Sequence, residues 1–185
     1  GILAYPETLQ KTISRRNIVA NNDIPNKEKD NAESPARIPI SGVGTINNIV
    51  ILAAFSDHWD DVNGTILSTK GRTAAEYDAL FNKQGYSEGQ AVGSVRDYYN
   101  EVSYGKLEIN SIVFSWVKLP NNEAYYGSND GYGWDVRPQE MVYDAIEATE
   151  TAGFNFSQGD SDGDGWIDCL TIIHSGHGEE WSGNP

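Results

Sequence analysis

Residues 46–55 constrain the fold more than any other stretch of this chain. They read I-N-N-I-V-I-L-A-A-F. A strand with one face in water alternates apolar and polar residues, because successive side chains point to opposite faces. In this run, the residues that would point to one face and those that would point to the other are both mostly apolar. This is typical of a central strand covered on both sides. We therefore predict a sheet that carries other elements on its two faces.

The overall composition limits the classes of partner. The chain has 185 residues, of which 38% are hydrophobic and 11% aromatic, enough for one packed domain or most of one. Thirteen basic residues stand against twenty-seven acidic ones, giving a net charge of -14. Such a surface repels phosphate backbones and attracts cations, so we expect no nucleic-acid partner. No apolar stretch approaches the roughly 20 residues of a membrane helix, so we expect no membrane partner.

The chain divides into two parts by composition. Residues 1–41 are rich in Asn, Lys, Glu and Pro, and residues 21–35 are almost free of apolar side chains. Such a segment cannot bury much apolar surface, so we interpret it as a leader or linker that is partly disordered. We expect the folded part to comprise residues 42–185.

Helical spacing dominates the middle of the chain. Thr73-Ala74-Ala75-Glu76 forms a capping-box pattern that predicts the start of a helix, which would end before Gly85. Apolar residues over 92–102 repeat at helical spacing and predict a second helix. Residues 106–119 are strand-like, but their alternation changes phase near residues 110–111, and a bulge is one explanation.

The C-terminal third adds one more helix and one more strand. Pro138 opens a helical pattern that ends at Gly153. The apolar run that includes residues 169–174 predicts a strand. The resulting order, β-α-α-β-α-β, indicates an α/β or α+β fold in which a mixed sheet carries packed helices.

Residues 160–168, which read D-S-D-G-D-G-W-I-D, carry the strongest chemical signal. Calcium prefers six to eight oxygen ligands, and a short loop supplies them by alternating ligand with spacer and placing Gly at the sharp turn. The pattern therefore predicts a calcium site. Its predicted ligands are four carboxylates and one backbone carbonyl: Asp160, Asp162, Asp164, Asp168 and the carbonyl of Trp166.

This loop departs from an EF-hand at its last position. The EF-hand ends with a bidentate Glu at its twelfth residue, whereas the twelfth residue here is Thr171, within the predicted strand. We therefore predict a calcium loop that leads into a strand. The simpler alternative is a solvated Asp/Gly-rich turn that binds nothing. A calcium loop functions best where calcium is millimolar. The single cysteine, Cys169, permits the cytosol but also suits secreted bacterial proteins that use calcium instead of disulfides. We therefore expect a secreted, extracellular protein.

Two other patterns have simpler interpretations. Zinc can be bound by the side chains of His174, His177, Glu179 and Glu180. Their spacing supports a zinc site only weakly. We favour a polar strand end whose side chains form local hydrogen bonds or help to bind calcium. Residues 85–89 match the G-x-S-x-G pattern of hydrolases, but a helical segment precedes them instead of the strand that this motif requires. We predict a loop there.

The remaining candidates are aromatic and acidic. Five tryptophans and ten tyrosines could stack on sugars, but most are expected to pack in the core and loops, because aromatic side chains bury large areas. His58 lies in F-S-D-H-W-D-D, directly after the predicted central strand. A second cation site is one interpretation of that cluster, and an acidic solvated turn is the one we favour.

Three stretches together resemble the immune inhibitor A family of secreted bacterial zinc metallopeptidases. They are residues 85–107 (G-Y-S-E-G-Q-A-V-G-S-V-R-D-Y-Y-N-E-V-S-Y-G-K-L), residues 160–168, and residues 172–180 (I-I-H-S-G-H-G-E-E), in the same order as in the family. The resemblance covers about residues 46–181. It implies a zincin-like fold, zinc-dependent endopeptidase activity on proteins and peptides, and zinc as a cofactor of the full-length enzyme. It also implies that residues 1–41 are the end of a pro-segment and its connection to the catalytic domain.

The chain lacks the zinc motif of that family. In H-E-x-x-H, two histidines one helical turn apart bind the metal and the Glu acts as general base, but no His in this chain is followed by Glu. In relatives this helix lies C-terminal to the H-x-G-x-G-E-E stretch. The resemblance thus implies the N-terminal half of a catalytic domain, inactive alone, with its own C-terminal half as a partner and no catalytic residue here.

A second function class remains open. The chain could be a calcium-stabilised binding module that recognises a protein or a glycan through exposed tyrosines. An H-E-x-x-H helix encoded within about a hundred residues downstream, a distance typical of one domain, would favour the enzyme. Its absence would favour the module.

Overall fold

The computed structural model describes residues 43–133 and 135–176. The predictions made for residues 1–41, and those for His177, Glu179 and Glu180, lie outside the described residues. Within the described part, no helix is both long and apolar enough to cross a membrane.

The central element is strand β1 (Gly44–Ala54), as the apolar run predicts. Strand β4 (Leu107–Val113) pairs with its first half, from Gly44↔Leu107 to Val50↔Val113. Strand β6 (Cys169–His174) pairs with its second half. The short strand β5 (Val117–Lys118) pairs with Ala53–Ala54. The segment expected as one strand over residues 106–119 is therefore two strands separated by residues 114–116.

All described pairings of this sheet are parallel, which corrects the expectation of a mixed sheet. The antiparallel pairing of strands is confined to a separate hairpin, β2 (Trp59–Asp60) with β3 (Thr65–Ile66). Two neighbouring strands can be parallel only if a long connection returns the chain to the same end of the sheet. Helices provide such connections between β1 and β4 and between β5 and β6, which explains why these strands are parallel.

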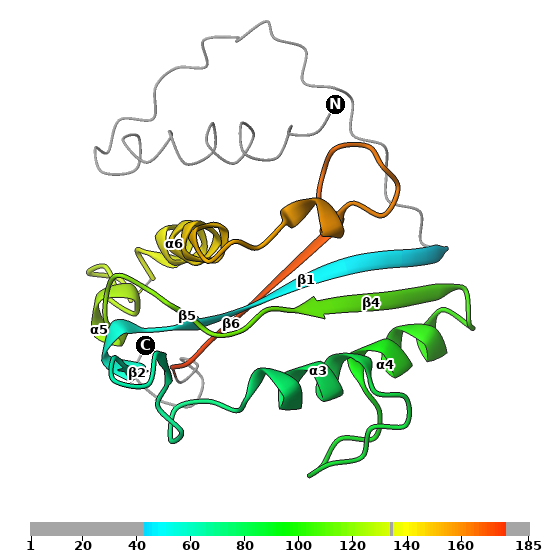
Figure 1. Cartoon of the computed structure of the whole chain (residues 1–185), viewed down its shortest axis with the longest axis horizontal. Coiled ribbons are helices and arrows are strands. Elements are labelled where there is room, and N and C mark those ends of the chain that lie inside the picture. Colours follow the sequence, from blue (N-terminus) through cyan, green and yellow to red (C-terminus); the bar gives the residue numbers. More distant parts are fainter. Residues whose placement is uncertain (1–42, 134, 177–185) are drawn as a thin grey trace, which may run out of the picture.

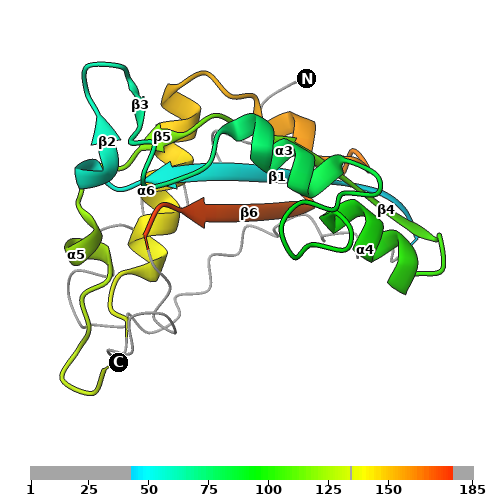
Figure 2. The same cartoon turned by 90° about the horizontal axis from the view of Figure 1, so that it is seen from below.

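The helices lie on opposite faces of the sheet, in three layers (Figure 1). Helices α3 (Ala74–Asn82) and α4 (Val95–Val102) cover one face. Helix α6 (Pro138–Thr151), the short helix α5 (Glu123–Tyr126) and the 3₁₀ turn η2 (Phe156–Gly159) belong to the other side. Viewed from below, β1 and β6 run side by side, and α3 lies over β1 (Figure 2).

Strand β1 contributes to two separate hydrophobic cores. Ile49, Ile51 and Ala53 pack with α6 residues on one side, and Val50 and Leu52 pack on the other, where α3 lies. All five are fully buried. Burial on both faces explains why the run lacks polar alternation, and it confirms the predicted central strand.

The helix termini follow their sequence signals. Thr73 and Glu76 exchange the two hydrogen bonds of the predicted capping box at the start of α3. The second helix begins later than its apolar spacing predicted, because Ser94 and Asp97 form a capping box of their own. Val92, counted in the predicted helix, lies outside it and is exposed.

Candidate functional site

The predicted calcium loop connects η2 to β6. Asp160, Asp162 and Asp168 each place one carboxylate oxygen within 4.8 Å of the others. A cluster that offers only oxygen atoms suits a hard cation such as calcium and does not suit a soft metal. The structure therefore brings together three of the predicted carboxylates, in an arrangement that fits the chemistry predicted for them.

The backbone of the loop folds around Asp160. Its carboxylate accepts hydrogen bonds from three successive amides, those of Gly163 at 2.7 Å, Asp164 at 3.1 Å and Gly165 at 3.0 Å. Gly163 and Gly165 both have a positive φ, of 76° and 88°. A side chain would be strained at these two positions, which explains the glycines that follow Asp162 and Asp164.

Hydrogen bonds within the loop orient Asp164 and Asp168. The Asp164 carboxylate lies outside the group of three and accepts from the Trp166 amide at 2.8 Å. Asp168 accepts hydrogen bonds from the amide of Ser161, at 3.0 Å, and from its hydroxyl. Calcium ligation by Asp164 and by the Trp166 carbonyl therefore stays a prediction.

The loop is fixed to the core at both ends. The Asp168 amide donates to the Gly159 carbonyl at 2.8 Å and closes the base of the loop. Gly159 is buried against β1 so closely that a Cβ atom there would lie 2.5 Å from Ile49 Cδ1. A cation bound in this loop would act on the start of β6 and, through Gly159, on the central strand.

A second group of polar residues gathers where the parallel strands end. In open α/β sheets the crevice beyond the carboxyl ends of the strands is the usual place for a ligand site. Strands β1, β5 and β6 all end at this edge, because they are parallel. The residues that follow them include His58 in the 3₁₀ turn η1 (Ser56–His58), which is 3% exposed, and Ser175, which is 8% exposed.

His58 thus differs from its sequence interpretation. We favoured an exposed acidic turn, whereas the imidazole is buried and contacts Ser175 Oγ through Nδ1 at 2.8 Å and Glu123 Oε2 through Nε2 at 3.2 Å. The acidic residues around it point elsewhere: Asp57 accepts from the Glu123 amide, and Asp61 pairs with Lys118. No sequence signal connected residues 58, 123 and 175, because they are far apart in the chain.

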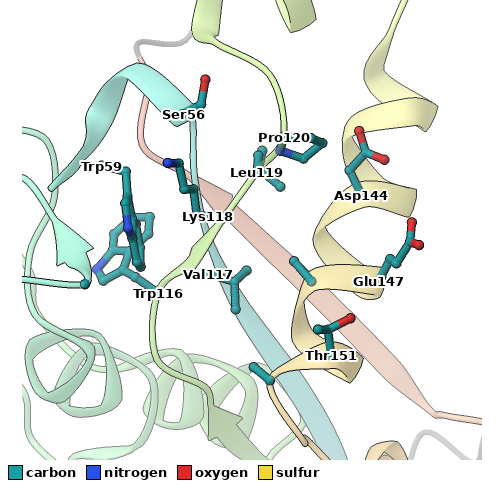
Figure 3. A pocket seen from close by; sticks show the side chains of 13 residues that line it. Ser56, Trp59, Trp116, Val117, Lys118, Leu119, Pro120, Asp144, Glu147 and Thr151 are labelled. Carbon is teal, nitrogen blue, oxygen red and sulfur yellow. The ribbon is translucent and has the colours of Figure 1, made fainter. Parts of the chain in front are cut away.

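A groove of about 960 Å³ lies beside this edge (Figure 3). Trp59 and Trp116 form part of one side, strand β5 lies between, and α6 forms the other side with Asp144 and Glu147. Asp144 is buried and accepts a hydrogen bond from the Tyr126 hydroxyl at 2.6 Å. Burial, and then this hydrogen bond, raises the pKa of Tyr126 well above its usual value. The groove combines aromatic and acidic walls.

The two weaker sequence patterns have simple structures. Ser87 lies in a loop after α3, with no strand leading into it, so the predicted loop is confirmed. His174 ends β6, and its Nδ1 accepts from the Gly176 amide at 3.3 Å. Among the described residues, only the Asp160, Asp162 and Asp168 cluster gathers three side chains that could hold a metal. No histidine of the described part belongs to such a cluster.

Comparison with known proteins identifies similarity over most of the chain. Residues 41–184 match the model of the immune inhibitor A peptidase M6 catalytic domain. Immune inhibitor A from Bacillus thuringiensis subsp. alesti is 31% identical over 136 residues, covering 58% of this chain and 20% of the relative. The pre-pro-metalloprotease PrtV from Vibrio cholerae serotype O1 (strain M66-2) is 26% identical over 182 residues, covering 84% of this chain and 20% of the relative. The chain thus spans about a fifth of the length of these curated relatives.

Proposed function

The chain belongs to the immune inhibitor A peptidase family, and from that membership we propose that it forms the N-terminal part of the catalytic domain of a secreted, zinc-dependent endopeptidase. The observation that carries the proposal is the family match, which spans residues 41–184 and therefore the whole described sheet. Protein and peptide substrates follow from the same assignment. Secretion is supported by the calcium-type loop and the single cysteine.

Among the described residues, the one group of three potential metal ligands contains no histidine. His58 is engaged with Glu123 and Ser175, and His174 Nδ1 accepts from Gly176. The sequence contains no H-E-x-x-H motif. We therefore assign no catalytic residue to this chain and expect the metal-binding helix to come from sequence beyond it, with which this part would assemble as its own C-terminal half. Alone, the chain is expected to be inactive.

The role of this part would be to support that helix and to present substrate, as in a zincin-like subdomain. Among the described residues, no strand pairs with the outer edge of β6. An exposed strand edge offers backbone groups to an extended peptide, which binds as an additional strand. We propose that a substrate segment lies along β6 in the assembled enzyme.

Calcium is the cofactor that we assign to this chain itself. The three converging carboxylates of Asp160, Asp162 and Asp168 repel one another, and a bound cation would neutralise them. Because the loop leads directly into β6 and is fixed to β1 at Gly159, calcium would stabilise the same strand that is proposed to present substrate. Its role would be structural.

The test is to identify the gene segment downstream of Pro185 and to express the longer protein. We expect an H-E-x-x-H motif within about a hundred residues, the scale of one domain. We also expect stoichiometric zinc and hydrolysis of casein that a Glu→Gln change in that motif abolishes. A downstream sequence without the motif, or a zinc-free protein without activity, would refute the assignment.

The groove beside the sheet favours one alternative. The partly exposed ring of Trp59 could hold a glycan or a protein segment by stacking, and the chain would then be a calcium-stabilised binding module without catalysis. Trp59→Ala would abolish binding of such a partner. The same substitution should leave peptidase activity of the longer protein intact if the enzyme assignment is correct.

A further inference from the structure

His58 joins three segments that are distant in the chain. It follows β1, Glu123 begins α5, and Ser175 follows β6. The imidazole lies between the other two side chains, with Nδ1 2.8 Å from Ser175 Oγ and Nε2 3.2 Å from Glu123 Oε2. We call these three residues the His58 relay. A buried imidazole with both nitrogens engaged is a fixed part of the structure.

The hydrogen-bonding capacity of each group defines the direction of the relay. An ionised Glu123 carboxylate only accepts, so the proton between the two residues belongs to Nε2. Ser175 Oγ already accepts from the Phe55 amide at 3.1 Å. Its own proton needs an acceptor, which the lone pair on Nδ1 of a neutral imidazole provides. The Ser175 hydroxyl and both imidazole nitrogens are then satisfied when Ser175 donates to His58 and His58 donates to Glu123.

Close backbone contacts hold the relay in place. A Cβ atom on Gly176 would lie 2.3 Å from Glu123 Oε1 and 2.6 Å from Phe55 Cε2, so the carboxylate packs directly against the backbone after β6. The Glu123 amide also donates to Asp57 Oδ1 at 3.1 Å. Glu123 is therefore held by η1 from two sides and packs against the residue that follows Ser175. A side chain at position 176 would force Glu123 and Phe55 to move.

We propose that His58 is a positioning residue, which fixes the direction in which the chain leaves the sheet after β6. This inference rests on the proposed function, because the chain beyond Gly176 leads to His177, Glu179 and Glu180 and, in the proposed enzyme, to the metal-binding helix. The relay acts through Ser175, not on the substrate. A displacement of about 1 Å far from the reacting atoms can lower a rate about 100-fold.

Two substitutions separate the two hydrogen bonds of the imidazole. In His58→Asn the amide reaches about as far as Nδ1 and can retain the Ser175 contact. In His58→Gln the amide reaches about as far as Nε2 and can retain the Glu123 contact. Neither variant connects the two partners. Asp61→Asn is the control, because it weakens the exposed ion pair with Lys118 near the same turn without touching the relay.

The first measurement is made on this 185-residue chain by nuclear magnetic resonance. We expect the ¹⁵N shifts of the His58 ring to show the tautomer with the proton on Nε2. We expect the Ser175 amide, which donates to the Ala53 carbonyl, to exchange about tenfold faster in His58→Gln, which loses the Ser175 contact, by a smaller factor in His58→Asn, and at the wild-type rate in the control. A ring protonated on Nδ1 alone, or exchange equal to wild type in both variants, would overturn the relay.

The second measurement uses the longer protein and its peptidase kinetics. We expect both His58 variants to lower kcat by about 10 to 100-fold while KM stays within about twofold, because positioning affects the transition state more than ground-state binding. Wild-type activity in both variants would refute the positioning role and leave the peptidase assignment intact. An inactive wild-type protein would refute the peptidase and, with it, the positioning role, whereas the exchange data would still decide whether the relay exists.

Discussion

The side chain of Asn48 on β1 accepts a hydrogen bond from the hydroxyl of Thr171 on β6 at 3.0 Å. On its other side, Asn48 donates to Ser111 Oγ on β4 at 3.2 Å. One amide thus connects three neighbouring strands at a position that is 3% exposed. A shift of either neighbour by one residue would place these polar groups on the wrong face, so the contact specifies the register of the sheet.

Asn48→Ala is expected to destabilise the protein by about 1–3 kcal/mol, because it leaves the hydroxyls of Ser111 and Thr171 without their partner. Urea unfolding monitored by circular dichroism measures this change. Asn47→Ala is the control: Asn47 exchanges exposed contacts with Asn110 and Gln158, and its loss should cost about 0.5 kcal/mol. Equal effects of the two substitutions would contradict the register role.

Asp162→Ala combined with Asp164→Ala is expected to lower the melting temperature in millimolar calcium and to have little effect in chelator. A calcium loop depends on the number of its charged ligands. Calorimetric titration of the chelator-treated wild type should show calcium binding below millimolar concentration. Glu101→Gln, which removes an exposed charge on α4, is the control. Identical melting curves for the double variant and wild type would eliminate a structural role for calcium.

Gly159→Ala is expected to destabilise the protein by about 1–3 kcal/mol, because the new methyl group would overlap Ile49. Gly131→Ala is the control, because no atom lies within 4 Å of a Cβ atom placed at that position. If the calcium loop is coupled to β1 through this contact, Gly159→Ala should also weaken calcium binding. A variant as stable as Gly131→Ala would show that the contact relaxes without cost.

Acid should loosen the starts of α3 and α4 together. Hydrogen bonds from the Ser94 amide, first, and from Gly85 hold the pKa of Asp97 below its usual value, and Thr73 does the same for Glu76. A pKa lowered in the folded state adds stability above the unfolded value of about 4 and loses it as pH falls through the folded value. Unfolding at pH 6 and pH 3 should therefore differ less for Asp97→Asn than for wild type. A pH dependence identical to wild type would contradict this.

Local patterns were sufficient to predict the central strand, three helices and β6. They failed at Ser111. Its hydroxyl occupies a buried position between Ile109 and Val113, so the strand continues through it without the bulge that the apolar pattern suggested. The partner that makes a polar residue acceptable there, Asn48, lies 63 residues away. Hydrophobic periodicity describes neighbouring residues in the chain and cannot predict a pair so far apart in sequence.

In the candidate site, too, the sequence predicted local features but not contacts between distant residues. Spacing of the aspartates predicted four carboxylate ligands, and three of these carboxylates converge, because a loop of nine residues is a local structure. The Asn63-Gly64 pair could have revealed the β2–β3 hairpin, since Asn-Gly is a strong turn signal. By contrast, His58 is followed by an exposed acidic sequence and becomes buried only when Glu123 and Ser175 reach it.

The parallel arrangement around β1 has a consequence for the order of folding. Among the described strands, β1 is the first to be synthesised. One edge of β1 pairs with β6, where Cys169 follows its register partner Asn48 by more than a hundred residues. Pairings between such distant residues form slowly, because a long loop must close before the contacts can form. Even when β4 has paired with β1, an emerging chain therefore lacks a partner for the other edge until β6 has been made. An unpaired strand edge promotes aggregation, so we expect the chain to need protection until β6 pairs with it.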